Sequence, residues 1–132
     1  MCLDDIVTDV EPITEGYKIY RRLNKDKLIP EYFGSPIKIG KWYNSSSLIR
    51  RLLFGKYIQT SNGKKYEHGF HVFHNLENAK YYRDWSYPQG IIVKVMIKNP
   101  ICVGLQNRFT SNDFVTVARQ IKVIEVLPDL PE

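Results

Sequence analysis

The chain has 132 residues, of which 43% are hydrophobic and 13% aromatic, and its formal net charge is +5. A chain of this length buries one hydrophobic core, which argues against several large domains. Its apolar runs are shorter than the roughly 20 residues that cross a bilayer, and residues 1–9 are acidic where a signal peptide is basic. These features predict a cytoplasmic protein without a membrane partner.

Acidic and basic residues are segregated along the chain. Residues 1–15 contain five carboxylates and no basic residue, whereas residues 16–66 contain twelve lysines and arginines against two carboxylates. We interpret residues 1–15 as an acidic, mobile arm that either folds back over the basic half or solvates the terminus. A single domain is predicted at 16–127, followed by a tail at 128–132. The basic half indicates an anionic partner, or else serves only solubility.

Short strands separated by turns are predicted for the first third of the chain. They cover residues 16–23, 28–33 and 37–43. The polar residues 24–27 form a turn, and Pro30 confines the second strand to a sheet edge because proline donates no backbone hydrogen bond. The serines at 45–47 then cap a short amphipathic helix that ends at Gly55. Residues 61–63 predict a tight turn.

The clearest pattern is a strand, a helix and a second strand in succession. Residues 69–74 alternate with the period of two that a strand requires. Asn75 offers a side-chain oxygen to free backbone N–H groups, so a helix is expected from Leu76. Residues 91–98 then alternate as a half-buried strand, which Asn99 and Pro100 are expected to close.

The C-terminal part predicts further extended structure. A strand at 101–105 precedes a polar, mobile connection at 106–113, and strands follow at 114–117 and 121–127. Residues 118–120 interrupt the last two strands, which predicts a bend or bulge. The elements together predict an α+β fold, a single compact domain with a mainly antiparallel, twisted sheet of five to seven short strands and one or two helices on one face.

The three histidines, His68, His71 and His74, lie within seven residues of one another. Residues three apart on a strand point to opposite faces, so His71 and His74 do not converge on one metal ion, and no cysteine is close in sequence. Either of these two is instead a candidate for hydrogen bonding or stacking on a ligand. The alternative is a half-buried imidazole with a purely structural role.

Catalytic signatures are missing from the sequence. It contains no phosphate-binding glycine-rich loop, no Gly-x-Ser-x-Gly elbow and no Cys-x-x-Cys motif, and its carboxylates are scattered. No catalytic residue, metal or cofactor is therefore assigned. Cys2 and Cys102 occupy such different settings that they predict reduced thiols.

Aromatic and basic residues alternate in three places, at 17–22, 41–43 and 81–85. Flat rings stack on bases while guanidinium and ammonium groups hold phosphates, so these segments indicate a nucleotide or a single strand. The alternative is that the rings fill the core. Arg108 and Arg119 are further candidates for phosphate contacts. The candidate ligand-binding residues are Tyr20, Arg22, Trp42, His71, His74, Tyr82, Arg108 and Arg119.

Six different short segments together characterise the chain. They are Gly-Tyr-Lys-Ile-Tyr at 16–20, Ile-Gly-Lys-Trp-Tyr at 39–43, Gly-Phe-His-Val-Phe at 69–73, Leu-Glu-Asn-Ala at 76–79, Ile-Val-Lys-Val at 92–95 and Val-Ala-Arg-Gln-Ile-Lys-Val-Ile-Glu-Val at 117–126. This pattern, which spans about residues 16–127, resembles small phage-type proteins of unassigned function. The resemblance implies a viral setting, with the host cell cytoplasm as the location, and specifies no ligand.

The order of three predicted elements carries another resemblance. These elements are a strand at 69–73, a helix that contains Ala79 and Tyr82, and a strand at 91–95. In this order the chain resembles ADP-ribosyltransferase-like folds. Gln120 stands close to where that family has a glutamate, so no catalytic residue is carried over. The resemblance implies an ADP-ribosyltransferase-like enzyme as one alternative function.

Non-enzymatic binding of an anionic partner is the function that the sequence favours. The phage-type resemblance makes a nucleotide-type signal of host immunity the most specific ligand, which the protein would sequester. An anti-CRISPR-like inhibitor that binds a host nucleic-acid-processing effector is the second hypothesis, and the transferase is the third. Nucleic acid is a further candidate partner, and the sequence leaves a homodimer open.

Overall fold

Two long antiparallel strands, β9 (Ile91–Leu105) and β10 (Phe114–Val126), form the centre of the fold. The structure is a computed structural model that describes residues 3–30, 36–45, 57–106 and 113–128. The strands that flank this pair are β1 (Asp5–Val7), β2 (Glu15–Arg22), β3 (Lys27–Pro30), β4 (Ile37–Lys38), β5 (Trp42–Asn44) and β8 (Phe70–Phe73). The sheet order is β1-β9-β10-β8-β2-β3-β4, with β5 paired to β10 and β2 also paired to β9.

A two-stranded hairpin and one helix complete the described part of the chain. The hairpin consists of β6 (Tyr57–Gln59) and β7 (Lys65–Glu67), and helix α2 (Leu76–Ser86) connects β8 to β9. The predicted α+β class with an antiparallel sheet is confirmed. The predicted five to seven strands are too few, because the main sheet has eight. Strand β1 comes from the N-terminal segment, and the strand predicted at 37–43 is divided into β4 and β5. The strands predicted separately at 91–98 and 101–105 form the single strand β9, and those predicted at 114–117 and 121–127 form β10.

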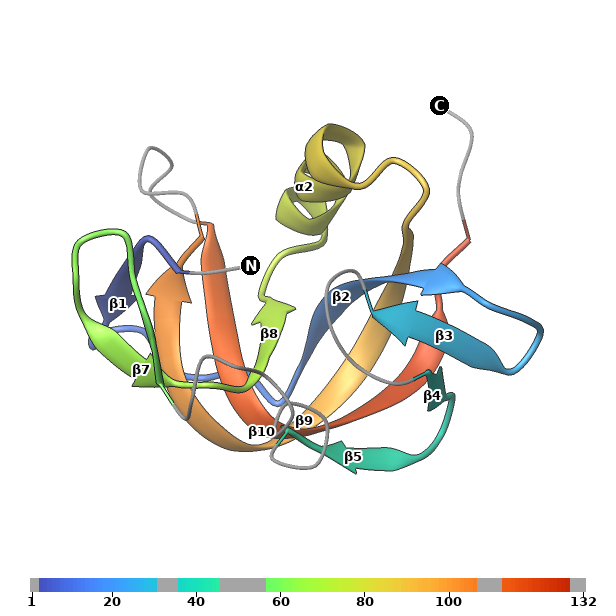
Figure 1. Cartoon of the computed structure of the whole chain (residues 1–132), viewed down its shortest axis with the longest axis horizontal. Helices are drawn as coiled ribbons and strands as arrows, with labels where there is room; N and C mark the ends of the chain where they lie inside the picture. The colour runs from blue at the N-terminus through green and yellow to red at the C-terminus, as the bar shows by residue number, and fades with distance from the viewer. Residues whose placement is uncertain (1–2, 31–35, 46–56, 107–112, 129–132) are drawn as a thin grey trace.

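The central strands bend at a proline. Asn99 has a positive φ of 55°, and the pairing of β9 with β10 shifts register between Val117 and Ala118. Proline lacks the ladder donor and is tolerated at such an irregularity. The expectation that Asn99 and Pro100 end the strand is wrong, because β9 continues to Leu105, with Pro100 opposite Ala118 and Cys102 opposite Val117. The bend predicted in β10 is confirmed, and Figure 1 shows both strands curving along the bottom of the molecule.

Helix α2 follows its sequence signals. The backbone N–H of Glu77 donates to the side chain of Asn75 at 2.8 Å, so the predicted N-cap is confirmed. Ala79 is its fully buried residue, and the helix packs on β2, β8 and β9. In Figure 1 the helix lies at the top of the molecule, above the curved strands.

The sheet buries apolar side chains in two clusters. On β9, Ile92 belongs to the cluster that includes Ala79 of α2, whereas its neighbours Val93 and Val95 belong to the other cluster. Successive residues of a strand point to opposite faces, so both faces of this strand contribute to the core. The alternating residues of β9 therefore contribute apolar side chains to both sides of the sheet.

The N-terminal segment is part of the domain. Leu3 is fully buried, its N–H donates to the hydroxyl of Tyr66 at 3.0 Å, and the N–H of Asp4 donates to the carbonyl of Leu105 at 2.8 Å. Strand β1 then pairs with β9. Residues 3–7 of the segment predicted as a mobile arm are thus packed against the sheet by a buried leucine and a strand pairing.

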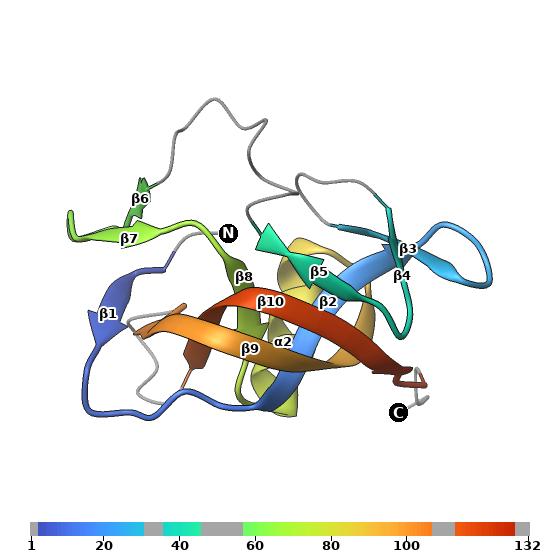
Figure 2. The ribbon, with the colours of Figure 1, turned by 90° about the horizontal axis from the view of Figure 1, so that it is seen from below.

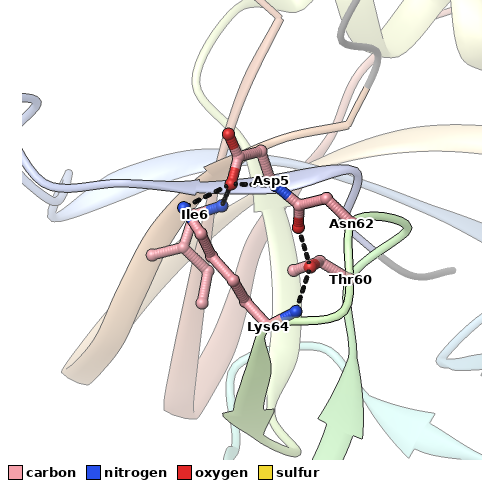
Figure 3. Close-up of polar contacts among 5 residues, drawn as sticks. All are labelled: Asp5, Ile6, Thr60, Asn62 and Lys64. Atoms are coloured by element: carbon pink, nitrogen blue, oxygen red, sulfur yellow. Dashed lines mark hydrogen bonds and ion pairs between the residues drawn. The ribbon is translucent and has the colours of Figure 1, made fainter.

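Asp5 joins this segment to the loop between β6 and β7, as Figure 3 shows. Its Oδ1 accepts from the N–H of Ile6 at 2.8 Å and from Asn62 Nδ2 at 2.8 Å, and it lies 2.9 Å from Lys64 Nζ. Lys64, and then Asn62 and Ile6, lower the pKa of Asp5 to about 2. Gly63, at a φ of 89°, forms the predicted turn. The acidic segment thus folds back onto a lysine of the basic half.

Several predicted features lie outside the described residues. They are the helix after the serines at 45–47, residues 31–33 of the second predicted strand, Cys2, Arg108 and the tail beyond Pro128. Cys102 is a free, half-buried thiol, and burial raises its pKa to about 11. In the described part of the chain, no helix combines the length and the apolar character needed to cross a membrane.

Candidate functional site

Tyr20 is a core residue and not a surface ring. Only 1% of it is exposed, it packs in the same cluster as Leu28 and Ile37, and burial raises the pKa of its hydroxyl. Strand β2 directs this side chain into the interior. The expectation that Tyr20 stacks on a ligand is therefore wrong.

His71 is also buried, with 8% of the residue exposed. Its Nε2 lies 2.9 Å from the hydroxyl of Tyr66, and that hydroxyl accepts the N–H of Leu3. Burial, helped by the positive charge of Lys18, lowers the pKa of His71 to about 3, so the imidazole is neutral. Its contacts join β8, β7 and the N-terminal segment, which is a structural role and corrects its assignment to a ligand site.

His74 is half-buried on the same strand. Its Nε2 lies 2.6 Å from Thr116 Oγ1, its ring centroid is 6.0 Å from that of Phe114, and burial lowers its pKa. These contacts match the structural alternative for this histidine. Within the described residues, no group of three or more histidine, cysteine or carboxylate side chains is arranged to hold a metal ion.

The two described candidate arginines are exposed and have partners within the protein. One Nη of Arg22 donates to the carbonyl of Lys25 at 3.0 Å. Arg119 donates to Glu67 Oε2 from Nε at 3.0 Å and from Nη2 at 2.7 Å. A phosphate that binds Arg119 has to compete with this carboxylate.

Trp42 lies among lysines, and these residues form the strongest candidate site. Lys98 Nζ is 4.1 Å and Lys122 Nζ 5.3 Å from the centroid of the indole ring. Lys41 Nζ is 5.5 Å from the ring centroid of Tyr43, whose hydroxyl accepts the N–H of Lys38 at 2.7 Å. We call Trp42, Lys98 and Lys122 the Trp42 surface, whereas Tyr43, with Lys41 over its ring, packs against the core on the other face.

Strand pairing positions the Trp42 surface. Trp42 of β5 is the register partner of Lys122 in β10, and Tyr43 is the partner of Ile121. Ile121 is fully buried, so Lys122 points to the opposite face, and Trp42 shares that face. Lys98 lies on β9 beside the bend and faces Gln120 across the ladder. Figure 2 shows β5 alongside β10.

The charge of the Trp42 surface is not neutralised by the described part of the protein. Lys38, Lys41, Lys98 and Lys122 form no ion pair with an acidic side chain among the described residues, whereas Lys64, Lys94 and Arg119 do. Each lysine keeps its ammonium group available to an external anion. Two of these groups, those of Lys98 and Lys122, lie over the indole of Trp42 and supply charge beside a stacking platform.

Lys98 and Lys122 were not among the residues that the sequence singled out. Each is one lysine in an alternating strand, and nothing local distinguishes it from a solvated position. Only the pairing of β5 with β10 places Trp42 beside them. The local pattern at residues 41–43, two rings after a lysine, contains Trp42 but neither Lys98 nor Lys122.

A concave region lies beside α2, and we call it the α2 cleft. It has a volume of about 290 Å³ and is lined by Tyr81, Tyr82, Trp85, Ser86, Gln106 and Asp113. Tyr82 also packs on Phe73, with ring centroids 5.5 Å apart. Of the predicted site residues within the described part, Tyr82 is the one that lines this cleft.

Comparisons of the chain with models of protein families, with curated proteins and with solved structures give no match.

Proposed function

We propose that this protein is a non-enzymatic binding protein that holds an anionic, ring-bearing ligand on the Trp42 surface. The most specific ligand is a nucleotide-type signal of host immunity, which the protein sequesters from its receptor. The observation that supports this most is the position of Lys98 and Lys122 over the indole of Trp42, without an acidic partner in the described residues.

The energies of the competing contacts favour exchange of a lysine for a base. An exposed cation–π contact contributes about 0.5–1 kcal/mol. A base stacked on an aromatic side chain contributes about 1–3 kcal/mol. A base therefore displaces the ammonium group of Lys98 from the ring at little cost. The displaced ammonium then pairs with the phosphate of the same ligand in a charge-assisted hydrogen bond, which strengthens the complex further.

Sequestration requires only affinity, and this agrees with the composition of the site. The Trp42 surface consists of two lysines and an indole ring and has no carboxylate or histidine that would act as a general base. A phage-type protein of this kind would lower the free concentration of a signal without converting it. The resemblance of the chain to phage-type proteins supports this setting.

Fluorescence of Trp42 tests the proposal directly. The chain has two tryptophans, so Trp85→Phe leaves Trp42 as the only indole. Titration of this variant with a cyclic dinucleotide should give a saturable change in emission. In the same background, Lys98→Gln with Lys122→Gln should weaken binding tenfold or more, since each charge-assisted hydrogen bond contributes about 1.5–3 kcal/mol.

The matched control changes two exposed lysines elsewhere, Lys25→Gln with Lys27→Gln, and alters the net charge equally. It should leave the affinity unchanged. Equal losses in both double variants would mean that net charge alone attracts the ligand. Absence of any emission change with a cyclic dinucleotide and with a single-stranded oligonucleotide would refute the proposal.

Two further measurements separate the alternative functions. Stoichiometric co-purification of a nucleic-acid-processing effector from infected cells, with no nucleotide bound, would favour the anti-CRISPR-like inhibitor. Release of nicotinamide on incubation with NAD would favour the ADP-ribosyltransferase-like enzyme. Native mass spectrometry of the purified protein reports a retained small molecule and the oligomeric state together.

A further inference from the structure

The α2 cleft is separate from the Trp42 surface and is not used by the proposed binding of an anion. Its volume of about 290 Å³ is close to the lower end of ligand pockets, which span about 300–1,000 Å³. Trp85 is 75% and Tyr81 59% exposed, with ring centroids 6.1 Å apart and planes inclined by 43°. The described part of the chain has four large exposed apolar side chains, and two of them lie here. The cleft thus offers a small volume flanked by accessible rings.

The wall of the cleft contains a buried carboxylate. Asp113 is 8% exposed, and its Oδ1 is buried without a hydrogen-bond partner in the described structure. Its backbone carbonyl accepts the N–H of Gln106 at 3.0 Å, which fixes the two residues beside each other. Buried acceptors in native proteins nearly always have a donor. Asp113 lines the cleft, so its carboxylate is the charged group of the cleft wall.

The electrostatics of the cleft are negative. Burial, and then the negative charge of Asp4, raise the pKa of Asp113 to about 6, so the carboxylate is mainly ionised at neutral pH. The residues that line the cleft include no basic side chain. A cation in the cleft would therefore be attracted by Asp113 and by the more distant Asp4.

We propose that the α2 cleft binds a guanidinium group, carried by a free small molecule or by an arginine side chain of a partner. A guanidinium is planar, so it stacks on the rings of Tyr81 and Trp85, and its N–H groups donate to Asp113. An alkylammonium has no flat face to stack. A phosphorylated nucleoside would bring further negative charge toward Asp113.

Fluorescence of Trp85 tests this site without interference from the other. Trp42→Phe leaves Trp85 as the only indole, and agmatine is the first probe. A saturable change in emission is expected, and Asp113→Asn in this background should weaken binding tenfold or more. Asp84→Asn is the matched control, because Asp84 is an exposed carboxylate on the same helix, paired with Arg83. It should bind agmatine like the parent.

An uncharged analogue makes the test specific for charge. N-carbamoylputrescine has a ureido group in place of the guanidinium, and it should bind at least tenfold more weakly than agmatine. Tyr81→Ala, a change at an exposed position, should also weaken agmatine binding and leave the melting temperature unchanged. N-acetyl-arginine amide distinguishes the two sources of the guanidinium group. Tighter binding of this probe than of agmatine indicates an arginine side chain of a partner and not a free small molecule.

Three results would overturn the inference. They are equal affinity of the Asp113→Asn variant, equal affinity of the ureido analogue, and binding of guanosine in the absence of agmatine binding. Because each tryptophan reports one site, failure at the α2 cleft leaves the proposal for the Trp42 surface standing, and the reverse also holds.

Discussion

The two tryptophans of this chain lie in opposite electrostatic surroundings. Trp42 has the ammonium groups of Lys98 and Lys122 over its ring, whereas Trp85 lines a cleft whose charged side chain is the carboxylate of Asp113. Figure 1 shows their elements on opposite sides of the molecule, with β5 at the bottom and α2 at the top. The same side chain thus lies beside lysines in one place and beside a carboxylate in the other, because the fold supplies different neighbours.

The two regions also differ in how they are supported. The Trp42 surface lies on β5, β9 and β10 near the bend, where the described ladder pairs every strand involved. The α2 cleft depends on a helix with one fully buried residue and on the ends of β9 and β10, where Gly104 packs against the N-terminal segment. A change in the N-terminal segment should therefore affect the cleft and spare the surface.

Gly104→Ala is expected to have the largest effect on stability. A Cβ at this position would clash with the carbonyl oxygen of Asp5 and with Leu3 Cδ1, so β1 has to move. Overpacking and the exposure of Leu3 should together cost about 3 kcal/mol. Urea denaturation measures this loss. In the absence of urea, at a temperature at which the variant is folded, agmatine binding should fall while nucleotide binding at Trp42 persists. Equal losses of affinity at both sites would contradict the claim that the two sites are supported separately.

Asp113→Asn should stabilise the protein at high pH. The folded-state pKa of Asp113 is raised from 3.8 to about 6, so the native state binds more protons than the unfolded state between these values. Stability of the parent therefore falls as pH rises from about 4 to about 6, and above that range the penalty is complete. The variant should gain on the order of 2 kcal/mol at pH 8 and nothing at pH 4. Denaturation curves at the two pH values measure the difference, and an equal gain at both would show that charge is not the cause.

Lys98→Gln should change stability little. The cation–π contact with Trp42 is exposed, so its loss should cost about 0.5–1 kcal/mol. The same substitution should reduce affinity for a cyclic dinucleotide far more than it reduces stability. Thermal unfolding measures the loss of stability, and the Trp42 titration measures the loss of affinity. A stability loss as large as the binding loss would mean that Lys98 supports the fold and not a ligand.

Lys64→Ala should have the smallest effect, because its ion pair with Asp5 joins two exposed side chains. The pKa of Asp5 is lowered to about 2, so the pair stabilises the protein above pH 4 and loses its contribution as pH falls toward 2. The difference in stability between parent and variant should vanish over this window. A difference that grows at low pH would contradict the assignment. Neither tryptophan titration should respond.

Local signals were sufficient for the elements whose cause is local. The cap at Asn75 and the glutamate that follows predicted α2 because capping is a contact between neighbours in sequence. The interruption of the last strand predicted the bulge after Val117 for the same reason. The prediction that Asn99 and Pro100 end a strand was wrong, because a long partner strand can accommodate a proline and pair with the residues on both sides of it.

The candidate residues also differ in whether a local pattern or the tertiary structure determined their surroundings. Trp42 and Tyr82 reached accessible regions, whereas Tyr20 and His71 were drawn into the core by the face of the strand on which they lie. A ring beside a basic residue has the same sequence pattern in both settings. Asp113 carried no signal at all, since its carboxylate matters only through burial beside α2.

The sequence by itself determined the sheet-rich α+β class, the position of α2 and the excess of positive charge, because periodicity, capping and composition act within a few residues. The tertiary structure alone decided which lysines surround Trp42, which carboxylate faces Trp85 and that the acidic N-terminal segment packs into the domain. Those outcomes depend on pairing between strands that are distant in the chain, and on which of two strand faces is buried. A change of register by one residue reverses both faces, and no local pattern specifies it.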